Sequence, residues 1–300
     1  MGQIVDVNDL SRSFGSKSAL DGVSFRATAG QVYGLVGANG AGKTTLLKHL
    51  LGLLRATTGS VRVFGFDPVR EPVRVLGRVG YLSEERELPE WMRIDELMAY
   101  TQAFHPTWDA SYARALIETF GLDPSKKVKE LSKGMRAQAG LVAAVAHRPE
   151  LLILDEPSSG LDAVVRRDIL DAIVRTVADD GRTVIFSSHL LEEVERMSDH
   201  VTMLHGGRVT LSGALDDVRQ GYRRSRVRFA EHFEQPPVLD DALAMEGGGR
   251  TWSVVHSGSL DPFRHSVLAL GGEVVESRDA TLEEIFLARA GRSRQTAEVA

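Results

Sequence analysis

Cysteine is absent from this chain of 300 residues, which excludes a disulfide framework, thiol catalysis and cysteine-ligated zinc or iron–sulfur centres. Long apolar runs are absent as well. The longest near-apolar stretches, such as 139–146 and 151–154, are far shorter than the run of about 18 residues that spans a bilayer. The opening sequence MGQIVDVNDL has no signal-peptide pattern. These absences predict a soluble protein, and any association with a membrane would be peripheral.

An excess of positive charge is also missing. The formal net charge is −5 and the sequence pI is about 6.0, which argues against a general nucleic-acid binder, so we expect no nucleic-acid partner. The hydrophobic content of 43% is ample for a buried core. The length suits one large domain, or a large domain with a small appendage.

Glycine, by contrast, is concentrated in GLVGANGAGKTTLLKHLLGLL, residues 34–54. Residues 37–44 fit the pattern G-x-x-x-x-G-K-[ST], between a strand predicted over Val32–Val36 and a helix predicted over 45–54. The N–H groups of such a loop and helix N-terminus form a positively polarised nest for phosphates. We therefore expect Lys43 to reach the terminal phosphates of a nucleotide and the Thr44 hydroxyl to ligate magnesium. The alternative is an ordinary glycine-rich turn between a strand and a helix.

Strand-like and helix-like segments alternate along the first two thirds of the chain. Residues 4–36 have the period-two alternation of short strands, and helical spacing dominates from 89 to 146. Apolar strands are predicted over 151–155 and 183–188, with a helix over 164–178 between them. This order predicts an α/β fold with a mostly parallel sheet covered on both faces, interrupted by a helical insertion at about 86–147.

After about residue 213 the pattern changes to that of a small α+β domain. Strands are predicted over 223–230, 251–258 and 272–279, and helices over 262–270 and 281–290. We therefore expect a large domain over 1–215, an accessory domain over 222–290 and a flexible tail over 291–300. A basic run precedes and enters the accessory domain; it comprises Arg219, Arg223, Arg224, Arg226 and Arg228. This run could contact anionic lipid or a partner, or it could be a solvated strand face and linker.

Polar residues follow the predicted apolar strands. LLILDE delivers Asp155 and Glu156 to a strand end, where open α/β sheets place their ligands. We expect Asp155 to hold magnesium through water and Glu156 to polarise the attacking water; the alternative is a core strand that ends in a polar turn. His189 follows the second strand and could hydrogen-bond a γ-phosphate or the catalytic carboxylate, or could be a surface or capping histidine. A metal site with the neighbouring glutamates 192 and 193 has no further support.

Three more features bear on a nucleotide. Ser132 and the Gly134 N–H stand at a predicted helix N-terminus and could bind phosphate, although an ordinary N-cap serine is equally consistent. Asp162 ends the turn SGLD beside the predicted carboxylate pair. Phe14 could stack on an adenine ring or belong to the core.

The motifs GANGAGKTT, LSKGM, LLILDEP, SGLD and the SSH that ends in His189 resemble, in this order, those of the ATP-binding cassette (ABC) transporter ATPases. The resemblance covers about residues 1–215, and GYLSEER and TLEEIF are most similar to the ATPase subunits of bacterial ABC-2-type exporters. It implies a P-loop NTPase of ABC type with an N-terminal antiparallel β subdomain, a mostly parallel core sheet, an inserted helical subdomain and a C-terminal α+β appendage.

The resemblance also implies roles for individual residues. Those assigned to the nucleotide are Phe14, Gly37, Asn39, Gly40, Ala41, Gly42, Lys43, Thr44 and Thr45. It makes Glu156 the general base and His189 the switch histidine, with Asp162 in the D-loop. Ser132 and Gly134 correspond to the signature that binds the ATP held by the opposite subunit.

Two positions depart from the family pattern. The signature reads LSKGM instead of LSGGQ, but Ser132 and Gly134 are retained. Glu84 in GYLSEER stands where the family usually has a glutamine that ligates magnesium and senses the permease. A carboxylate is also a magnesium ligand, so the implied metal set is Thr44, Asp155 and Glu84, while the extra negative charge leaves the switching behaviour open.

The resemblance implies an ATPase that uses ATP and Mg²⁺, dimerises around two ATP with a second copy or a homologous subunit, and drives a separate membrane permease, in the direction of export. It would then lie in the cytoplasm, against the inner face of the membrane through that permease. The alternative is a soluble ABC-type ATPase that acts on ribosomes or DNA; such relatives tend to carry two cassettes or a long coiled coil, and this chain has one phosphate loop and no sustained heptads. A P-loop kinase would leave LSKGM and SGLD unexplained.

Overall fold

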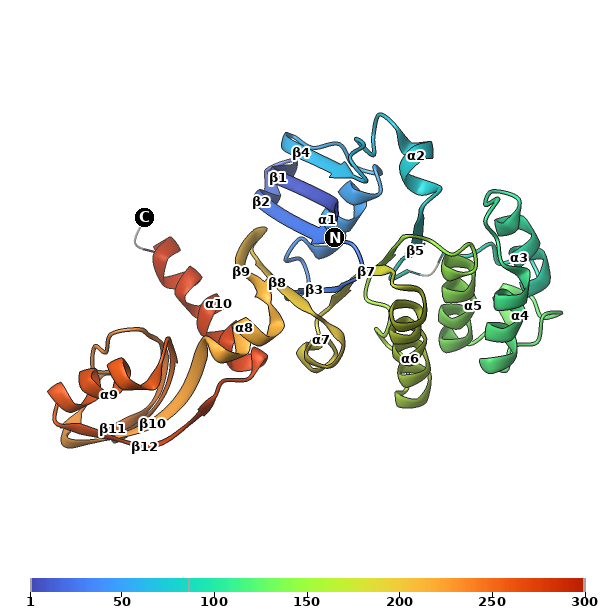
Figure 1. Cartoon of the computed structure of the whole chain (residues 1–300). Coiled ribbons are helices and arrows are strands. Elements are labelled where there is room, and N and C mark those ends of the chain that lie inside the picture. The colour runs from blue at the N-terminus through green and yellow to red at the C-terminus, as the bar shows by residue number, and fades with distance from the viewer. Residues whose placement is uncertain (1, 86, 299–300) are drawn as a thin grey trace. The chain divides into compact units, whose positions relative to one another are not determined.

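A computed structural model describes residues 2–85 and 87–298 of the chain. The chain divides into two compact units, Met1–Val209 and Thr210–Ala300, which are coloured from blue to red along the sequence in Figure 1. Among the described residues, no helix combines the length and the apolar character needed to cross a bilayer.

A six-stranded sheet with the order β5-β6-β7-β3-β8-β9 belongs to the first unit, except that its edge strand β9 continues past Val209. Its strands are β3 (Val32–Val36), β5 (Val79–Leu82), β6 (Leu151–Leu154), β7 (Thr183–Ser188), β8 (His200–His205) and β9 (Arg208–Ala214). The pairs β5·β6, β6·β7, β7·β3 and β3·β8 are parallel. Every residue of β3, β6 and β7 is buried, as expected of parallel strands covered on both faces. The predicted mostly parallel core sheet is confirmed.

An antiparallel sheet with the order β2-β1-β4 precedes this core. It is formed by β1 (Gln3–Phe14), β2 (Lys17–Thr28) and β4 (Thr58–Val63), which lie side by side in Figure 1. A turn through Gly15, with a φ of 59°, joins β1 to β2. Helix α1 (Lys43–Leu50) buries its leucines in the same hydrophobic cluster as alternate residues of β1. The sheet therefore packs around the helix that follows the glycine-rich loop.

Helices form a separate cluster within the first unit, as predicted for the insertion. They are α3 (Ile94–Gln102), α4 (Ala110–Thr119), the 3₁₀ turn η1 (Val128–Glu130) and α5 (Lys133–Val145). Their apolar faces share a core that includes Ile94, Leu97 and Val142. The remaining helices of this unit are α2 (Pro72–Leu76), α6 (Ala163–Asp180) and α7 (Leu191–Met197), and Figure 1 shows α3 to α6 standing next to one another.

The second unit is an antiparallel sheet with the order β11-β10-β12 and helices packed on it. Its elements are α8 (Leu215–Gln220), β10 (Tyr222–Phe233), β11 (Ala242–Ser257), α9 (Leu260–Ala269), β12 (Gly272–Asp279) and α10 (Leu282–Glu298). Phe263 and Val267 of α9 pack against Val227 and Phe229 of β10. The segment 291–298 of the predicted tail is helical within α10, and residues 299–300 lie outside the described part.

Four arginines of the basic run, 223, 224, 226 and 228, lie on β10 and are paired with acidic side chains, whereas Arg219 lies in α8. Arg226 of β10 faces Glu276 of β12 at 3.7 Å, and Arg228 faces Glu273 at 3.8 Å. Arg224 pairs with Glu284 of α10 at 2.6 Å. This arrangement favours the interpretation of the run as a charged strand face over that of an unpaired basic surface.

Candidate functional site

The glycine-rich loop brings its backbone close to neighbouring segments. Gly40 and Gly42 have φ angles of 81° and 108°, in the region that side-chain-bearing residues rarely adopt. A Cβ atom on Gly37 would lie 2.4 Å from the Leu204 carbonyl oxygen, and one on Gly42 would lie 2.7 Å from the Ala19 carbonyl oxygen. The loop therefore requires glycine at these positions.

The helix after the loop is shorter than predicted and begins earlier. Helix α1 runs from Lys43 to Leu50, whereas the sequence predicted 45–54. The early start follows from Gly42, which adopts the N-cap position. The segment 51–54 leaves the helix because the Leu53 and Leu54 N–H groups both turn back to the Lys48 carbonyl oxygen. Lys43 is thus the first residue of the helix, with its side chain at the helix N-terminus.

A cavity of about 380 Å³ lies over this loop and helix N-terminus. Its lining residues are Phe14, Lys17, Ala19, Asn39, Gly40, Ala41, Gly42, Lys43, Thr44, Thr45, Glu84 and Glu156. Phe14 is 48% exposed, so its ring belongs to the cavity wall and not to the core. The Arg12 guanidinium lies 4.8 Å from the centroid of this ring. Lys17 and Ala19 were not anticipated; they reach the cavity because the hairpin turn places the start of β2 beside Phe14.

Lys43 and Glu156 form a buried ion pair at the wall of this cavity. Lys43 Nζ lies 3.1 Å from Glu156 Oε1 and donates a hydrogen bond of 2.6 Å to the Gly37 carbonyl oxygen. Both side chains are almost completely buried. Glu156 also has a φ of 46°, a strained conformation for a residue with a side chain. The lysine charge is thus balanced by groups that an incoming polyanion can replace.

His189 holds the other oxygen of the same carboxylate. Its Nδ1 lies 2.7 Å from Glu156 Oε2, and its backbone N–H donates to that oxygen at 3.3 Å. The imidazole is partly exposed, whereas the Glu156 carboxylate is buried. Glu156 therefore stands between a lysine and a histidine, one on each oxygen.

Ser187 links the two carboxylate residues and was not anticipated. Its hydroxyl donates to Asp155 Oδ1 at 2.6 Å and accepts from the Glu156 N–H at 2.9 Å. The serine is fully buried at the end of β7, next to β6 in the sheet. The sequence signal for it, the polar ending of TVIFSS, is too weak to assign this role without the strand order.

The candidate magnesium ligands lie along the wall between two cavities. Thr44 and Glu84 line the 380 Å³ cavity and also a second, larger groove of about 880 Å³, which Asp155 lines as well. A hydroxyl and two carboxylates are hard oxygen donors of the kind that Mg²⁺ prefers, and phosphate oxygens would complete its ligand set. The described residues contain no cluster of three or more His, Asp or Glu side chains that could hold a metal ion without such a substrate. The donor set therefore fits a metal that arrives with a nucleotide.

The 880 Å³ groove separates the core sheet from the helical cluster. Its apolar lining includes Leu53, Val73, Leu76 and Phe104, all exposed. Burial, with a further contribution from the Asp155 charge, raises the pKa of Tyr81 in the same lining to about 12. The phenol of Tyr81 is therefore uncharged at neutral pH.

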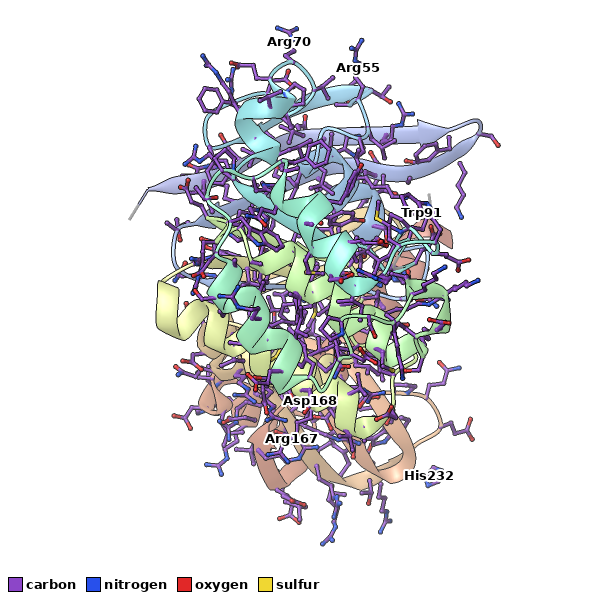
Figure 2. The ribbon with its side chains drawn as sticks, turned by 90° about the vertical axis from the view of Figure 1, so that its right-hand side faces the viewer. Arg55, Arg70, Trp91, Arg167, Asp168 and His232 are labelled. Carbon is purple, nitrogen blue, oxygen red and sulfur yellow. The ribbon has the colours of Figure 1, made fainter. Side chains whose placement is uncertain are left out.

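The large apolar side chains of the segment 91–108 divide into two groups. Met92 and Trp108 belong to the core of the helical cluster. Phe104 lines the groove, and Trp91, labelled in Figure 2, is 68% exposed. Trp91 and Phe104 are thus exposed, whereas Met92 and Trp108 are part of the helical core.

Ser132, Gly134 and Asp162 lie outside the cavity that holds Lys43. Within the described part of the chain, none of the three is among its lining residues. Ser132 caps α5 by accepting the Met135 N–H at 3.2 Å, and Asp162 caps α6 by accepting the Val164 and Val165 N–H groups. A Cβ atom on Gly134 would lie 3.0 Å from a methyl of Val165. The signature-like and SGLD segments therefore pack against each other, away from the glycine-rich loop.

The chain resembles proteins of known family along its whole length. It matches the family model named ABC transporter over residues 20–159. The daunorubicin resistance ATP-binding protein DrrA3 of Streptomyces coeruleorubidus is 32% identical over 314 residues, which cover 99% of this chain and 98% of that protein. Nod factor export ATP-binding protein I of Burkholderia lata is 32% identical over 302 residues, which cover 97% and 98%.

A solved structure of the ATP-binding subunit of an ABC transporter has the same fold. It aligns with a TM-score of 0.67 and 31% identity over 72% of this chain and 92% of that one. The two curated relatives align with this chain almost from end to end, so the similarity includes the second unit as well as the nucleotide cavity.

Proposed function

Since the chain belongs to the ABC transporter family of ATP-binding ATPases, we propose that it hydrolyses ATP in the cavity beside Lys43 and Glu156 to power a separate membrane permease. The observation that carries this proposal is the buried arrangement of Lys43, Glu156 and His189 at the cavity wall. A buried ion pair of this kind, next to open space, is available to exchange its partners for phosphate.

The chain's own residues account for nucleotide binding. The N–H groups of the loop around Gly40 and the N-terminus of α1 surround the triphosphate, and Lys43 turns from Glu156 to the terminal phosphates. Phe14 offers its exposed ring to the adenine. Lys17 adds a second cation to the cavity wall. Thr44, Glu84 and Asp155 would hold Mg²⁺, which neutralises charge on the phosphates during their transfer.

Glu156 is then free to act on water. When Lys43 moves to the phosphates, Glu156 keeps its contact with His189 and can accept hydrogen-bond donation from a water that attacks the γ-phosphorus. The water oxygen bonds to that phosphorus while its proton passes to the Glu156 carboxylate, and the bond from the phosphorus to the β,γ-bridging oxygen breaks. ADP and phosphate leave, and Glu156 returns the proton to the phosphate or to solvent. His189 keeps the carboxylate oriented through Oε2, while Oε1 faces the vacated lysine position.

The site is incomplete within one chain, which supports a dimer. Ser132 and Gly134 belong to a segment outside the cavity, and the family places this signature on the ATP of the opposite subunit. We infer that a second copy, or a homologous subunit, supplies Ser132, Gly134 and the Asp162 segment across the interface.

The groove of 880 Å³ is the surface we assign to the permease. Its exposed apolar side chains, Val73 and Phe104 among them, have no use in nucleotide binding. Docking there would hold the chain at the cytoplasmic face of the membrane. The Nod factor export protein and the daunorubicin resistance protein among the relatives support the export direction.

Size-exclusion chromatography of Glu156→Gln tests the composite site. The amide keeps the shape and removes a negative charge beside the triphosphate, so ATP stays bound and bridges two subunits. We expect a dimer with magnesium-ATP and a monomer without it. Adding Ser132→Arg places a bulky side chain where the γ-phosphate docks, so the dimer should disappear although ATP still enters the cavity of each subunit.

The matched control is Ser125→Arg, which changes an exposed serine of the same helical region. This variant should dimerise like its Glu156→Gln parent. A Ser132→Arg variant that dimerises as well as its parent would contradict the trans arrangement, and one cassette would then have to form its catalytic site alone.

A further inference from the structure

Helix α7 carries a buried carboxylate that the nucleotide site does not use. Glu193 is 6% exposed in the first turn of α7, whereas its neighbour Glu192 is exposed. Burying a carboxylate is unfavourable unless hydrogen bonds compensate it. Glu193 Oε2 accepts two such bonds, from the hydroxyls of Ser158 at 2.8 Å and Ser188 at 2.9 Å. Both serines are almost completely buried.

These serines belong to the two segments that flank the proposed general base. Ser158 lies two residues after Glu156 and directly precedes the SGLD turn, and Ser188 directly precedes His189. The Ser188 hydroxyl also accepts the Leu190 N–H at 3.0 Å, so it fixes the backbone on both sides of His189. A single oxygen of Glu193 thus ties the end of β6 and the end of β7 to α7.

The second oxygen of Glu193 faces the helix that follows the SGLD turn. Oε1 has no hydrogen-bond partner among the described residues and lies 3.9 Å from Arg166 Nε. Arg166 stands in the first turn of α6, whose N-cap is Asp162. The carboxylate is therefore placed between the SGLD turn, the start of α6 and the His189 segment.

We propose, resting on the proposed function, that Glu193 is a positioning residue that couples the SGLD turn to His189. The SGLD turn lies beside the signature-like segment that we assign to the partner's ATP, and His189 contacts the general base of its own ATP site. Through Glu193, a shift of the turn on dimerisation moves the His189 segment with it. The residue thereby sets the geometry of hydrolysis without touching the nucleotide.

The variants Glu193→Leu and Glu193→Gln distinguish a positioning role of Glu193 from a general effect on the stability of the fold. Leucine removes the acceptor for both serines, so we expect the kcat for ATP hydrolysis to fall by about 10- to 100-fold. The KM for ATP should stay within about twofold, since Glu193 does not line the nucleotide cavity in the described part of the chain. In Glu193→Gln, one amide carbonyl oxygen can occupy the Oε2 position and accept both bonds, so kcat should return to within about threefold of the unaltered chain.

Glu192→Leu and Glu192→Gln are the matched controls, because this glutamate is exposed on the same turn. Both should leave kcat unchanged. An unchanged kcat in Glu193→Leu, or an equal loss in Glu193→Gln and Glu193→Leu, would overturn the proposal. A parallel change of kcat and KM would also overturn it, because it would indicate general loss of the folded site.

A second set of variants keeps the test decisive if Glu193→Leu does not fold. Ser158→Ala together with Ser188→Ala removes both donors and keeps the carboxylate, and should reproduce the fall in kcat at constant KM. Combining these changes with Glu193→Gln should add no further loss, because the bonds are already gone. Full activity of the double serine variant contradicts the coupling. Absence of ATP hydrolysis in the unaltered chain would instead refute the proposed function.

Discussion

Each unit of the molecule contains one glutamate held between two basic side chains, but the two clusters are built differently. In the first unit, Glu156 lies 3.1 Å from Lys43 and 2.7 Å from His189. In the second unit, Glu284 lies 2.6 Å from Arg224 and 2.5 Å from Arg278. Each glutamate has two basic neighbours, so the number of basic partners does not distinguish the two clusters.

The difference lies in the backbone and in how fully the carboxylate is satisfied. Glu156 has a φ of 46° and lines the nucleotide cavity, and its Oε1 has an ion pair with Lys43 but no hydrogen bond among the described residues. Glu284 stands in the first turn of α10 and accepts the Thr281 N–H at 2.9 Å in addition to its arginine bonds. Burial raises the pKa of Glu284, but the hydrogen bonds from Arg278, Thr281 and Arg224 outweigh it and lower the pKa to about 2. A strained, incompletely bonded carboxylate can exchange partners, whereas a fully bonded one holds a structure together.

When each glutamate is replaced by glutamine, the largest difference between the two variants should be in the rate of ATP hydrolysis. Glu156→Gln should lower the rate of ATP hydrolysis by about 10² to 10⁴, because it removes the group that polarises water. Glu284→Gln should leave that rate within about twofold, since every proposed nucleotide contact lies in the first unit. Steady-state phosphate release measures both. Equal losses in the two variants would remove the distinction between the clusters.

The free energy of unfolding of the second unit should depend on Glu284, although the rate of ATP hydrolysis does not. Glu284→Gln replaces charge-assisted bonds by neutral ones and should lower the free energy of unfolding by about 1 to 3 kcal/mol at pH 7. The folded-state pKa of Glu284 is lowered from 4.5 to about 2, so its stabilising effect is present above pH 4.5 and is lost as the pH falls towards 2. The difference between the two proteins should therefore shrink over that range.

Urea unfolding followed by the fluorescence of Trp252 measures this effect, because Trp252 is buried in the core of the second unit. The background should carry Trp91→Phe and Trp108→Phe so that the signal reports that unit alone. A difference in unfolding free energy that is independent of pH between 7 and 2 would show that the Glu284 charge has no part in it.

Glu84→Gln should have the smallest effect on the isolated protein. Either side chain offers an oxygen to a metal at the wall of the nucleotide cavity, so basal magnesium-dependent hydrolysis should change by less than about threefold. A defect should appear only when the permease is present, as a loss of its stimulation of the ATPase. Complete loss of basal hydrolysis would mean that the Glu84 carboxylate takes part in catalysis.

The sequence predicted the elements that have strong local signals. Strands β3, β7 and β12 begin and end where the apolar runs and their flanking polar residues do. The short strand β5 was not predicted, because its four residues include a glycine and gain their stability from pairing with β6, which lies about 70 residues later. Helix α1 ended before its apolar run did, since its last turn bonds back to Lys48.

Some residues of the candidate site could likewise be predicted from the sequence, and others could not. The proximity of Lys43 to Glu156 follows from strand order once both motifs are recognised, because they follow the carboxyl ends of β3 and β6, the two parallel strands that flank β7. The roles of Ser187 and Glu193 could not be predicted, because each depends on a partner about 30 to 35 residues away along the chain, Asp155 and Ser158 respectively. A buried serine or glutamate acquires such a role only from the elements packed around it.

The wall shared by the nucleotide cavity and the groove has a thermodynamic consequence. Thr44 and Glu84 face both spaces, so a molecule that seats in the groove and shifts this wall changes the affinity of the cavity for ATP by some factor. By linkage, ATP must then change the affinity of the groove for that molecule by the same factor. If the permease docks in this groove, a nucleotide that tightens the hold on the permease must itself be held more tightly by the docked complex.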